Sequence, residues 1–326
     1  MKKLILFTAF LLVIAVGAIL PRYVLFKDKS VAGNQSIASP LPKILTKTFP
    51  GILGAEAESE YWKPNIDSVL DNGTKKPNLS AEAAIAYDVT TNTLLYERNI
   101  KTRLPIASLT KIMTATIALE TMKLNDVLTV SKSAAEIGED SMGLKEGDKL
   151  TLEDLLFGLV LKSGNDAGEV IAQDSPLGRD NFVYTMNKKA EDLGLTNTHF
   201  TNPTGLEGDG KQYSSAVDLL VMTRYALLDP DFTRIAATVE YEIPQTSDHS
   251  YYYLSNETNL LTSYPGVKGV KTGYTPEAGL CLVTFLDFKG HKIIAVLLNA
   301  QNRRQEMKDL LDYSLKTEGM VPPPHQ

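Results

Sequence analysis

The hydrophobic positions of this 326-residue chain divide it into an apolar N-terminal run, a polar segment rich in proline, and a long region patterned like a folded domain. The run from Leu4 to Leu20 carries no charged side chain and follows Lys2 and Lys3. Basic residues before an apolar run are typical of an export signal or a membrane anchor, with the lysines on the cytoplasmic side. We therefore expect residues 1–26 to place the rest of the chain in the cell envelope. The small residues at Ala15–Ala18 could form a signal-peptide cleavage site, so the sequence does not decide whether the run is removed. We favour an anchor that is retained.

Residues 27–78 have the pattern of a linker. Five prolines interrupt any long helix or central strand in this segment, namely Pro40, Pro42, Pro50, Pro64 and Pro77. If flexible, about fifty residues would have a root-mean-square reach of roughly 40 Å. The apolar stretches Ile44–Leu45 and Phe49–Leu53 leave open that part of the linker docks on the domain that follows.

The region from residue 79 to residue 316 predicts one α/β domain, followed by a short tail over 317–326. Apolar alternation and turn residues predict strands over 84–88, 93–97, 267–275, 280–287 and 292–299. Helical spacing and capping residues predict helices after Pro105, after Thr151, from Ser214 or Ser215 to Leu228, and over 303–316. A hairpin, helices, antiparallel strands and a closing helix indicate an antiparallel sheet covered by helices.

Composition narrows the classes of partner. A hydrophobic content of 43% and a charged content of 22% suit a globular domain with a full core. The net charge of −6 argues against nucleic acid. Cys281 is the only cysteine, which excludes an internal disulfide and a cysteine zinc cluster. The four histidines are scattered and form no H-E-x-x-H motif, so we expect no metal site and no cofactor.

Ser108-Leu109-Thr110-Lys111 is the first of three motifs that carry the chemistry. Residues three apart on a helix share a face, so Ser108 and Lys111 are expected to face each other as nucleophile and base. Lysine can accept a proton at neutral pH only if burial or a nearby cation lowers its pKa, and Lys271 could be that cation. Backbone N–H groups at the helix start would favour an oxyanion. If this motif stood alone, Ser108 could simply cap a helix and Lys111 could be a solvated surface lysine.

The other two motifs, Ser163-Gly164-Asn165 and Lys271-Thr272-Gly273, follow in order. The Ser163 hydroxyl could relay a proton, and the Asn165 amide could hold a substrate amide. On a strand, Lys271 and Thr272 beside a glycine could bind a substrate carboxylate whose backbone approaches closely. Each motif alone could be an ordinary helix end or edge strand. The inference of an active site therefore depends on the occurrence of all three motifs, in this order, in one chain.

Four longer segments resemble the serine D-alanyl-D-alanine carboxypeptidases, the low-molecular-mass penicillin-binding proteins of peptidase family S11. They are Arg103–Ala115, Ser163–Ala167, Thr198–Leu206 and Gly266–Thr275. The resemblance covers about residues 79 to 316. It implies a β-lactamase/DD-peptidase-like, or penicilloyl-serine transferase, fold, peptidoglycan stem peptides as substrates and β-lactams as covalent inhibitors.

The same resemblance implies a role for each motif residue. Ser108 would attack the carbonyl of the terminal D-alanyl-D-alanine bond, Lys111 would act as base, and Ser163 would pass a proton to the departing D-alanine. Asn165 would hold the substrate amide. The remaining site residues are expected to bind the terminal carboxylate (Lys271, Thr272), to let the substrate approach (Gly273), and to form the oxyanion hole through backbone N–H groups (Ser108, Tyr274).

Three other functions compete with the carboxypeptidase. A D,D-endopeptidase that cuts peptidoglycan cross-links would carry the same motifs. A β-lactamase of the commonest class carries S-D-N and a deacylating glutamate, whereas Gly164 stands in the middle of this motif. A wall-binding scaffold with a dead site is disfavoured because all three motifs are intact. Many family members also carry a second β-rich domain and a C-terminal anchor, and we expect the N-terminal run to replace that anchor here.

Overall fold

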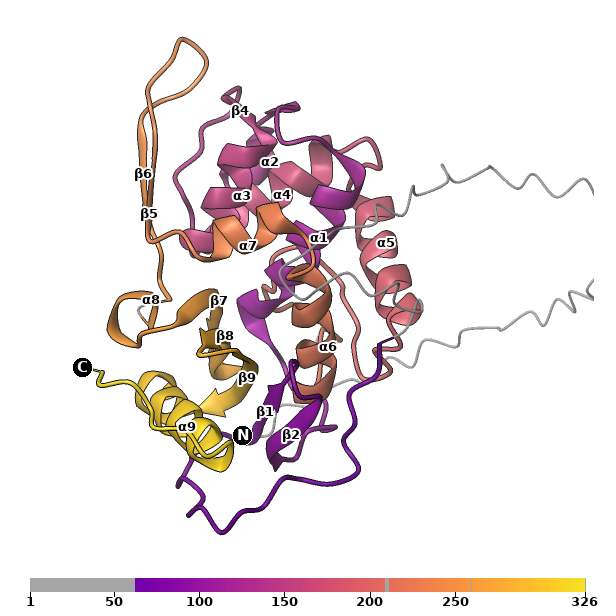
Figure 1. The fold of residues 1–326 in the computed structure, drawn as a ribbon. Coiled ribbons are helices and arrows are strands. Elements are labelled where there is room, and N and C mark those ends of the chain that lie inside the picture. Colours follow the sequence, from indigo (N-terminus) through magenta and orange to yellow (C-terminus); the bar gives the residue numbers. More distant parts are fainter. Residues whose placement is uncertain (1–61, 209–210, 259, 326) are drawn as a thin grey trace, which may run out of the picture. The chain divides into compact units, whose positions relative to one another are not determined.

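The computed structural model of the protein describes residues 62–208, 211–258 and 260–325 (Figure 1). The predicted anchor over 1–26 and most of the predicted linker over 27–78 lie outside these residues. Within the described ranges, no helix has both the length and the apolar character that a bilayer crossing requires.

A five-stranded antiparallel sheet forms the centre of the domain. Its strands are β1 (Ala83–Asp88), β2 (Thr93–Arg98), β7 (Val267–Thr275), β8 (Gly279–Phe288) and β9 (His291–Ala300), in the order β2-β1-β9-β8-β7. The sheet joins the two ends of the domain, because β1 pairs with β9 from Ala83 opposite Leu298 to Asp88 opposite Ile293. These strands confirm the sequence prediction. The order also leaves β7, which carries the third motif, at an edge of the sheet.

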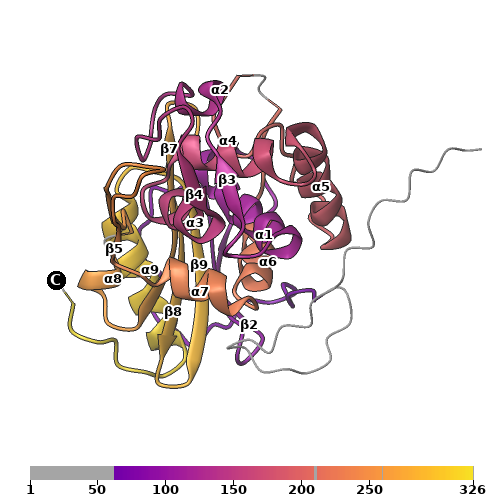
Figure 2. The ribbon, with the colours of Figure 1, turned by 90° about the horizontal axis from the view of Figure 1, so that it is seen from above.

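Helices cover both faces of the sheet (Figures 1 and 2). Side chains of β9 alternate between the faces, so Ile293 and Leu297 pack towards α9 (Arg303–Thr317), while Ile294 and Val296 pack into the larger core on the other side. The larger core includes α1 (Lys111–Thr121) and α6 (Ala216–Ala226). Burial on both faces explains why the sequence of β9 is almost continuously apolar.

The other described elements build a largely helical lobe beside β7. It comprises a 3₁₀ turn η1 (Ala107–Thr110), α2 (Lys132–Ala135), α3 (Leu152–Leu161), α4 (Asn165–Asp174), α5 (Arg179–Asp192), α7 (Pro230–Ala236), and the strand pairs β3 (Val127–Thr129) with β4 (Lys149–Thr151) and β5 (Glu240–Ile243) with β6 (Tyr252–Ser255). The short helix α8 (Leu260–Ser263) precedes β7 and contributes Leu260 to the smaller core on the α9 side of the sheet. The predicted caps are confirmed: the hydroxyls of Thr151 and Ser215 accept hydrogen bonds from Asp154 N and Asp218 N. Asp229, which follows α6, caps the start of α7 through its side chain.

Residues 62–78 and 317–325 lie against the domain, although the sequence assigns them to a linker and a tail. The Trp62 ring meets the Tyr87 ring edge-on at 5.7 Å, and Asn72 Nδ2 donates a hydrogen bond to Thr317 O at 2.9 Å. The imidazole of His325 stacks on Tyr264 with a centroid distance of 4.7 Å. These contacts are made by isolated side chains, which leave no periodic pattern in the sequence.

Candidate active site

The first two motifs meet around the amine of Lys111. Lys111 opens α1 and has no exposed surface, while Ser108 lies in the η1 turn just before it. Lys111 Nζ lies 2.7 Å from Ser108 Oγ, 2.8 Å from Asn165 Oδ1 and 2.7 Å from Thr204 O. A neutral amine has two N–H donors and one lone pair. The two oxygens of Asn165 and Thr204 can accept the donors, which leaves the lone pair for the Ser108 hydroxyl.

The surroundings of Lys111 favour that neutral amine. Its pKa is held well below the ordinary value of 10.5, first by burial and then by the charge of Lys271, against the opposing field of Asp140 and other carboxylates. A buried lysine with a depressed pKa and a serine hydroxyl within hydrogen-bonding distance can act as a nucleophile and base pair.

Two residues of this site have left-handed backbone conformations. Ala107, directly before the nucleophile, has φ +48°, and Ser163 has φ +60°. Such values are uncommon for residues with a side chain, and they occur where the surrounding structure enforces them. Ser163 links the end of α3 to the start of α4, so its hydroxyl and the Asn165 amide are both directed by this tight connection.

The third motif lies beside the nucleophile on the edge strand β7. Lys271 is almost completely buried, and burial is the main cause that lowers its pKa from 10.5 to about 8. A Cβ atom on Gly273 would lie 3.0 Å from Ile106 O and 3.2 Å from Ser108 N. The glycine therefore lets β7 approach the backbone of the nucleophile. Tyr274 follows with its side chain 59% exposed.

One open pocket collects residues of the second and third motifs, and it adds three charged residues that the motifs do not contain. The lining residues are Asp140, Ser163, Glu257, Thr272, Gly273, Tyr274, Leu280 and Arg303. Arg303, at the start of α9, donates to Gly273 O at 2.7 Å and brings a second cation close to Lys271. No local motif in the sequence marks these three charged residues, Arg303, Asp140 and Glu257. They reach the site only through the fold.

Asp166 was also missed as a functional residue, although it belongs to the segment with family resemblance. Its buried carboxylate accepts hydrogen bonds from Ser141 Oγ at 2.6 Å and from the backbone N–H groups of Met142, Gly143 and Leu144 at 3.0 to 3.1 Å. Asn165 N donates to Asp140 O at 2.8 Å in the same loop. Asp166 thus positions the loop that supplies Asp140 to the pocket.

Gly205 packs against the backbone of the turn that carries the nucleophile Ser108. It has φ +92°, and a Cβ atom there would lie 2.0 Å from Ala107 O. We expect Gly205→Ala to displace the η1 turn and to lower the rate of Ser108 acylation by a β-lactam at least ~100-fold, because misplacement by about 1 Å has effects of that size. We also expect it to lower the free energy of unfolding by about 2–4 kcal/mol. Acylation kinetics and denaturant melts would measure both.

Gly290→Ala is the matched control for this prediction. Gly290 has a similar φ of +90°, but no atom lies within 4 Å of the position that a Cβ atom would take there. The substitution therefore carries the backbone strain without the collision. Equal acylation rates in the two variants would contradict the packing role of Gly205.

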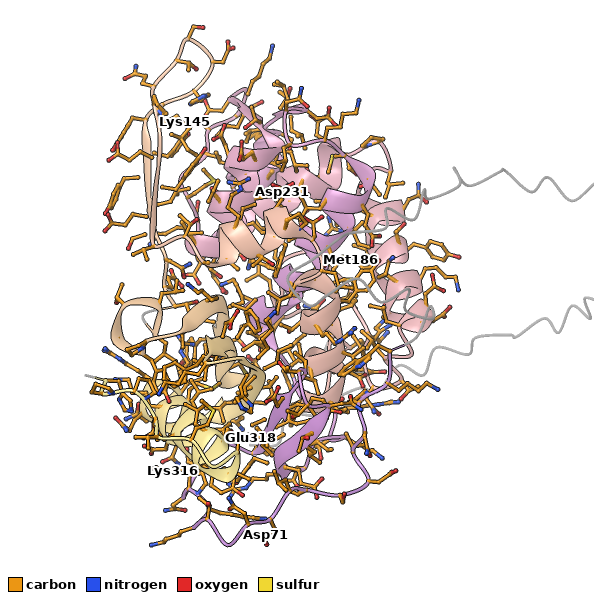
Figure 3. All side chains as sticks on the ribbon, viewed as in Figure 1. Asp71, Lys145, Met186, Asp231, Lys316 and Glu318 are labelled. Atoms are coloured by element: carbon orange, nitrogen blue, oxygen red, sulfur yellow. The ribbon has the colours of Figure 1, made fainter. Side chains whose placement is uncertain are left out.

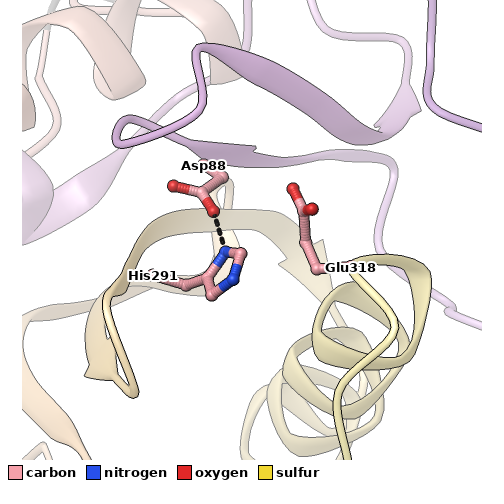
Figure 4. Close-up of side chains that lie close together, drawn as sticks. All are labelled: Asp88, His291 and Glu318. Atoms are coloured by element: carbon pink, nitrogen blue, oxygen red, sulfur yellow. Dashed lines mark hydrogen bonds and ion pairs between the residues drawn. The ribbon is translucent and has the colours of Figure 1, made fainter.

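Asp88, His291 and Glu318 form a separate cluster where β1 ends and β9 begins (Figure 4). Their possible ligand atoms lie within 4.8 Å of one another. His291 Nδ1 and Asp88 Oδ2 are 2.5 Å apart, whereas two ligands about 2.0 Å from a tetrahedral zinc ion would be separated by about 3.3 Å. The pair therefore has the geometry of a hydrogen bond that ties the two strand ends together.

Comparisons with known proteins identify the family of the chain. The sequence model of a peptidase family described as D-alanyl-D-alanine carboxypeptidase matches residues 71–302. The chain belongs to this family. The family model thus spans all three motifs and the central sheet.

Two curated relatives and one solved structure illustrate the range of the family. The chain is 36% identical over 242 residues to D-alanyl-D-alanine carboxypeptidase DacF of Bacillus subtilis, covering 72% of this chain and 62% of that protein. It is 33% identical to a D-alanyl-D-alanine endopeptidase of Pseudomonas aeruginosa, covering 71% and 75%. The crystal structure of the Streptomyces K15 DD-transpeptidase superimposes with a TM-score of 0.71 at 32% identity, covering 74% of this chain and 99% of that one. The DD-peptidase fold expected from the sequence is confirmed.

The match to DacF spans less than two thirds of that relative.

Proposed function

We propose that this protein is a serine D,D-carboxypeptidase that removes the terminal D-alanine from peptidoglycan stem pentapeptides. The observation that carries the proposal is the buried contact of Lys111 Nζ with Ser108 Oγ at 2.7 Å. Membership of the family supports the same substrate class and supports covalent binding of β-lactams.

In the proposed acylation, Lys111 removes the hydroxyl proton as Ser108 Oγ attacks the carbonyl carbon of the penultimate D-alanine. The backbone N–H groups of Ser108 and Tyr274 would stabilise the oxyanion. Ser163, which lines the pocket, would transfer its hydroxyl proton to the amide nitrogen as the C–N bond breaks, which releases D-alanine. Ser163 would then regain a proton from the ammonium of Lys111, which returns Lys111 to its neutral form. Water then attacks the ester, and Ser108 recovers its proton.

Substrate binding would divide between the third motif and the second motif. Lys271 and Thr272 would bind the terminal carboxylate, and the nearby charge of Arg303 would reinforce this site. Since β7 is an edge strand, the substrate backbone could lie beside it in an extended conformation. Asn165 would hold the substrate amide while its Oδ1 atom also keeps Lys111 in place.

The two lysines predict a bell-shaped dependence of kcat/KM on pH. Activity should rise as Lys111 loses its proton, at a pH well below its ordinary pKa of 10.5. It should fall above a pH of about 8, because Lys271 then loses the charge that binds the carboxylate. In Lys271→Arg the guanidinium stays charged, so we expect the alkaline limb to move to higher pH. A limb near pH 8 that persists in this variant would show that another group causes it.

Mass spectrometry of muropeptide products would test the proposed reaction. The full-length protein is incubated with uncross-linked pentapeptide and with cross-linked dimers. Loss of one alanine from the pentapeptide is the expected result. Cleavage of the dimer without that loss would instead identify an endopeptidase, the activity named for the Pseudomonas relative.

We also propose that residues 1–26 hold the protein at the outer face of the cytoplasmic membrane. Lys2, Lys3 and the apolar run that follows them support this placement. Fractionation with N-terminal sequencing would test it. We expect an intact N-terminus in the membrane fraction, and a mature chain that starts beyond residue 18 and washes off would contradict the proposal.

A further inference from the structure

The β5–β6 hairpin projects from the domain (Figure 1). One face of the hairpin contacts the rest of the domain. The Tyr241 ring stacks on Phe157 of α3 at 3.6 Å, and the Tyr252 hydroxyl donates to Asp148 at 2.6 Å. Near its tip, Lys149 N donates to Asp248 O at 3.1 Å. Lys145, labelled beside the hairpin in Figure 3, also donates to Ser250 Oγ at 3.2 Å. These contacts anchor the hairpin to the helical lobe.

The opposite face of the hairpin presents two exposed tyrosines. Tyr251 and Tyr253 are 49% and 50% exposed, and residues two apart on an extended strand point to the same side. On β5, Glu242 lies directly opposite Tyr253 across the hairpin, and Glu240 lies two residues earlier on the same side of its strand. Two aromatic rings and two carboxylates therefore share this exposed face of the hairpin.

The hairpin is continuous with the catalytic pocket. Glu257 lines the pocket and follows Tyr253 by four residues, a distance of at most about 14 Å along an extended chain. In a stem peptide, four residues separate the saccharide from the carbonyl that Ser108 would attack. When extended, they also span at most about 14 Å. The peptide is therefore long enough for the saccharide of a bound stem peptide to reach Tyr253.

We propose that the face formed by Glu240, Glu242, Tyr251 and Tyr253, here called the tyrosine face, binds the saccharide strand that carries the stem peptide. This inference rests on the proposed function. It names β-1,4-linked N-acetylhexosamines as the ligand, held outside the pocket in which the peptide reacts.

The chemistry of the tyrosine face suits an uncharged saccharide. The apolar C–H groups of a pyranose ring pack on the electron-rich face of an aromatic ring, as edge-to-face aromatic pairs do. The carboxylates of Glu240 and Glu242 can accept hydrogen bonds from sugar hydroxyls and from acetamido N–H groups. The same carboxylates would repel an anionic partner such as a phospholipid surface.

Turnover of two substrates by the full-length protein would test this inference. One substrate is the free pentapeptide, and the other is the same pentapeptide on a short glycan chain. In the double variant Tyr251→Ala, Tyr253→Ala, we expect kcat/KM for the glycan-linked substrate to fall about tenfold and kcat/KM for the free peptide to stay unchanged. Tyr184→Ala is the matched control, since Tyr184 is a 58% exposed tyrosine on α5. It should change neither value.

The outcomes separate this inference from the proposed function. Equal losses for both substrates, or no loss for either, would overturn saccharide binding by the tyrosine face. If the unsubstituted protein releases D-alanine from neither substrate, the proposed function fails instead. In that case, binding of a β-1,4-linked N-acetylglucosamine oligosaccharide, measured by calorimetry, still tests the tyrosine face: binding lost in the double variant supports the inference, and absence of binding to the unsubstituted protein refutes it.

Discussion

Ser108→Ala should abolish release of D-alanine, with a fall in kcat on the order of 10⁴-fold or more. Removal of the nucleophile in serine peptidases costs up to about 10⁶-fold. The reason here is the geometry of the site: Ser108 Oγ lies 2.7 Å from the buried amine, and the surrounding turn is fixed by Gly205 and Gly273. A coupled assay for D-alanine would measure the effect.

Ser133→Ala provides the control for this variant. Ser133 is an exposed serine on α2, and its hydroxyl contacts Gln173 rather than the pocket. It should retain full turnover. Substantial D-alanine release by Ser108→Ala, with an unfolding transition like that of the unsubstituted protein, would show that another group is the nucleophile.

Lys111→Met should lower the rate of Ser108 acylation by about 10³-fold or more, because loss of a general base typically costs 10² to 10⁴-fold. The methionine fills a similar volume, but Asn165 Oδ1 and Thr204 O lose their donor. We expect a loss of about 1–3 kcal/mol of stability for each acceptor left unsatisfied. Stopped-flow acylation by a β-lactam and thermal melts would separate the two effects.

Two further lysine variants sharpen this prediction. Lys111→Arg should not restore acylation, since a guanidinium cannot become a neutral base in a protein. Lys123→Ala removes an exposed lysine just beyond α1 and should leave acylation unchanged. Rapid acylation in Lys111→Arg would contradict the role of Lys111 as the base.

The elements that the sequence predicts well are those whose burial follows a simple period. Strands β8 and β9 have long apolar runs, and α3 starts with the cap at Thr151. By contrast, α4 was not predicted because buried charges interrupt its pattern. Glu169 is 2% exposed and is paired with Arg179 at 2.7 Å, and such a pairing cannot be found without the fold.

In the candidate site, too, local patterns could be predicted from the sequence and long-range contacts could not. The motif residues are recognisable because their spacing is local, as with Ser108 and Lys111 on consecutive turns. Arg303 reaches the pocket only because α9 begins next to the end of β9 and beside β8. Asp140 depends on a loop that is organised by the carboxylate of Asp166. Long-range positions of this kind follow from packing and cannot be read from spacing in the sequence.

The proposed function depends on a covalent acyl-enzyme at Ser108, which lies beside the pocket next to Gly273. Peptide mapping by mass spectrometry after incubation with benzylpenicillin would test it most directly. We predict one penicilloyl group per chain, on the peptide that contains Ser108, with slow release. A chain that remains unlabelled, or a label on any other residue, would contradict the account.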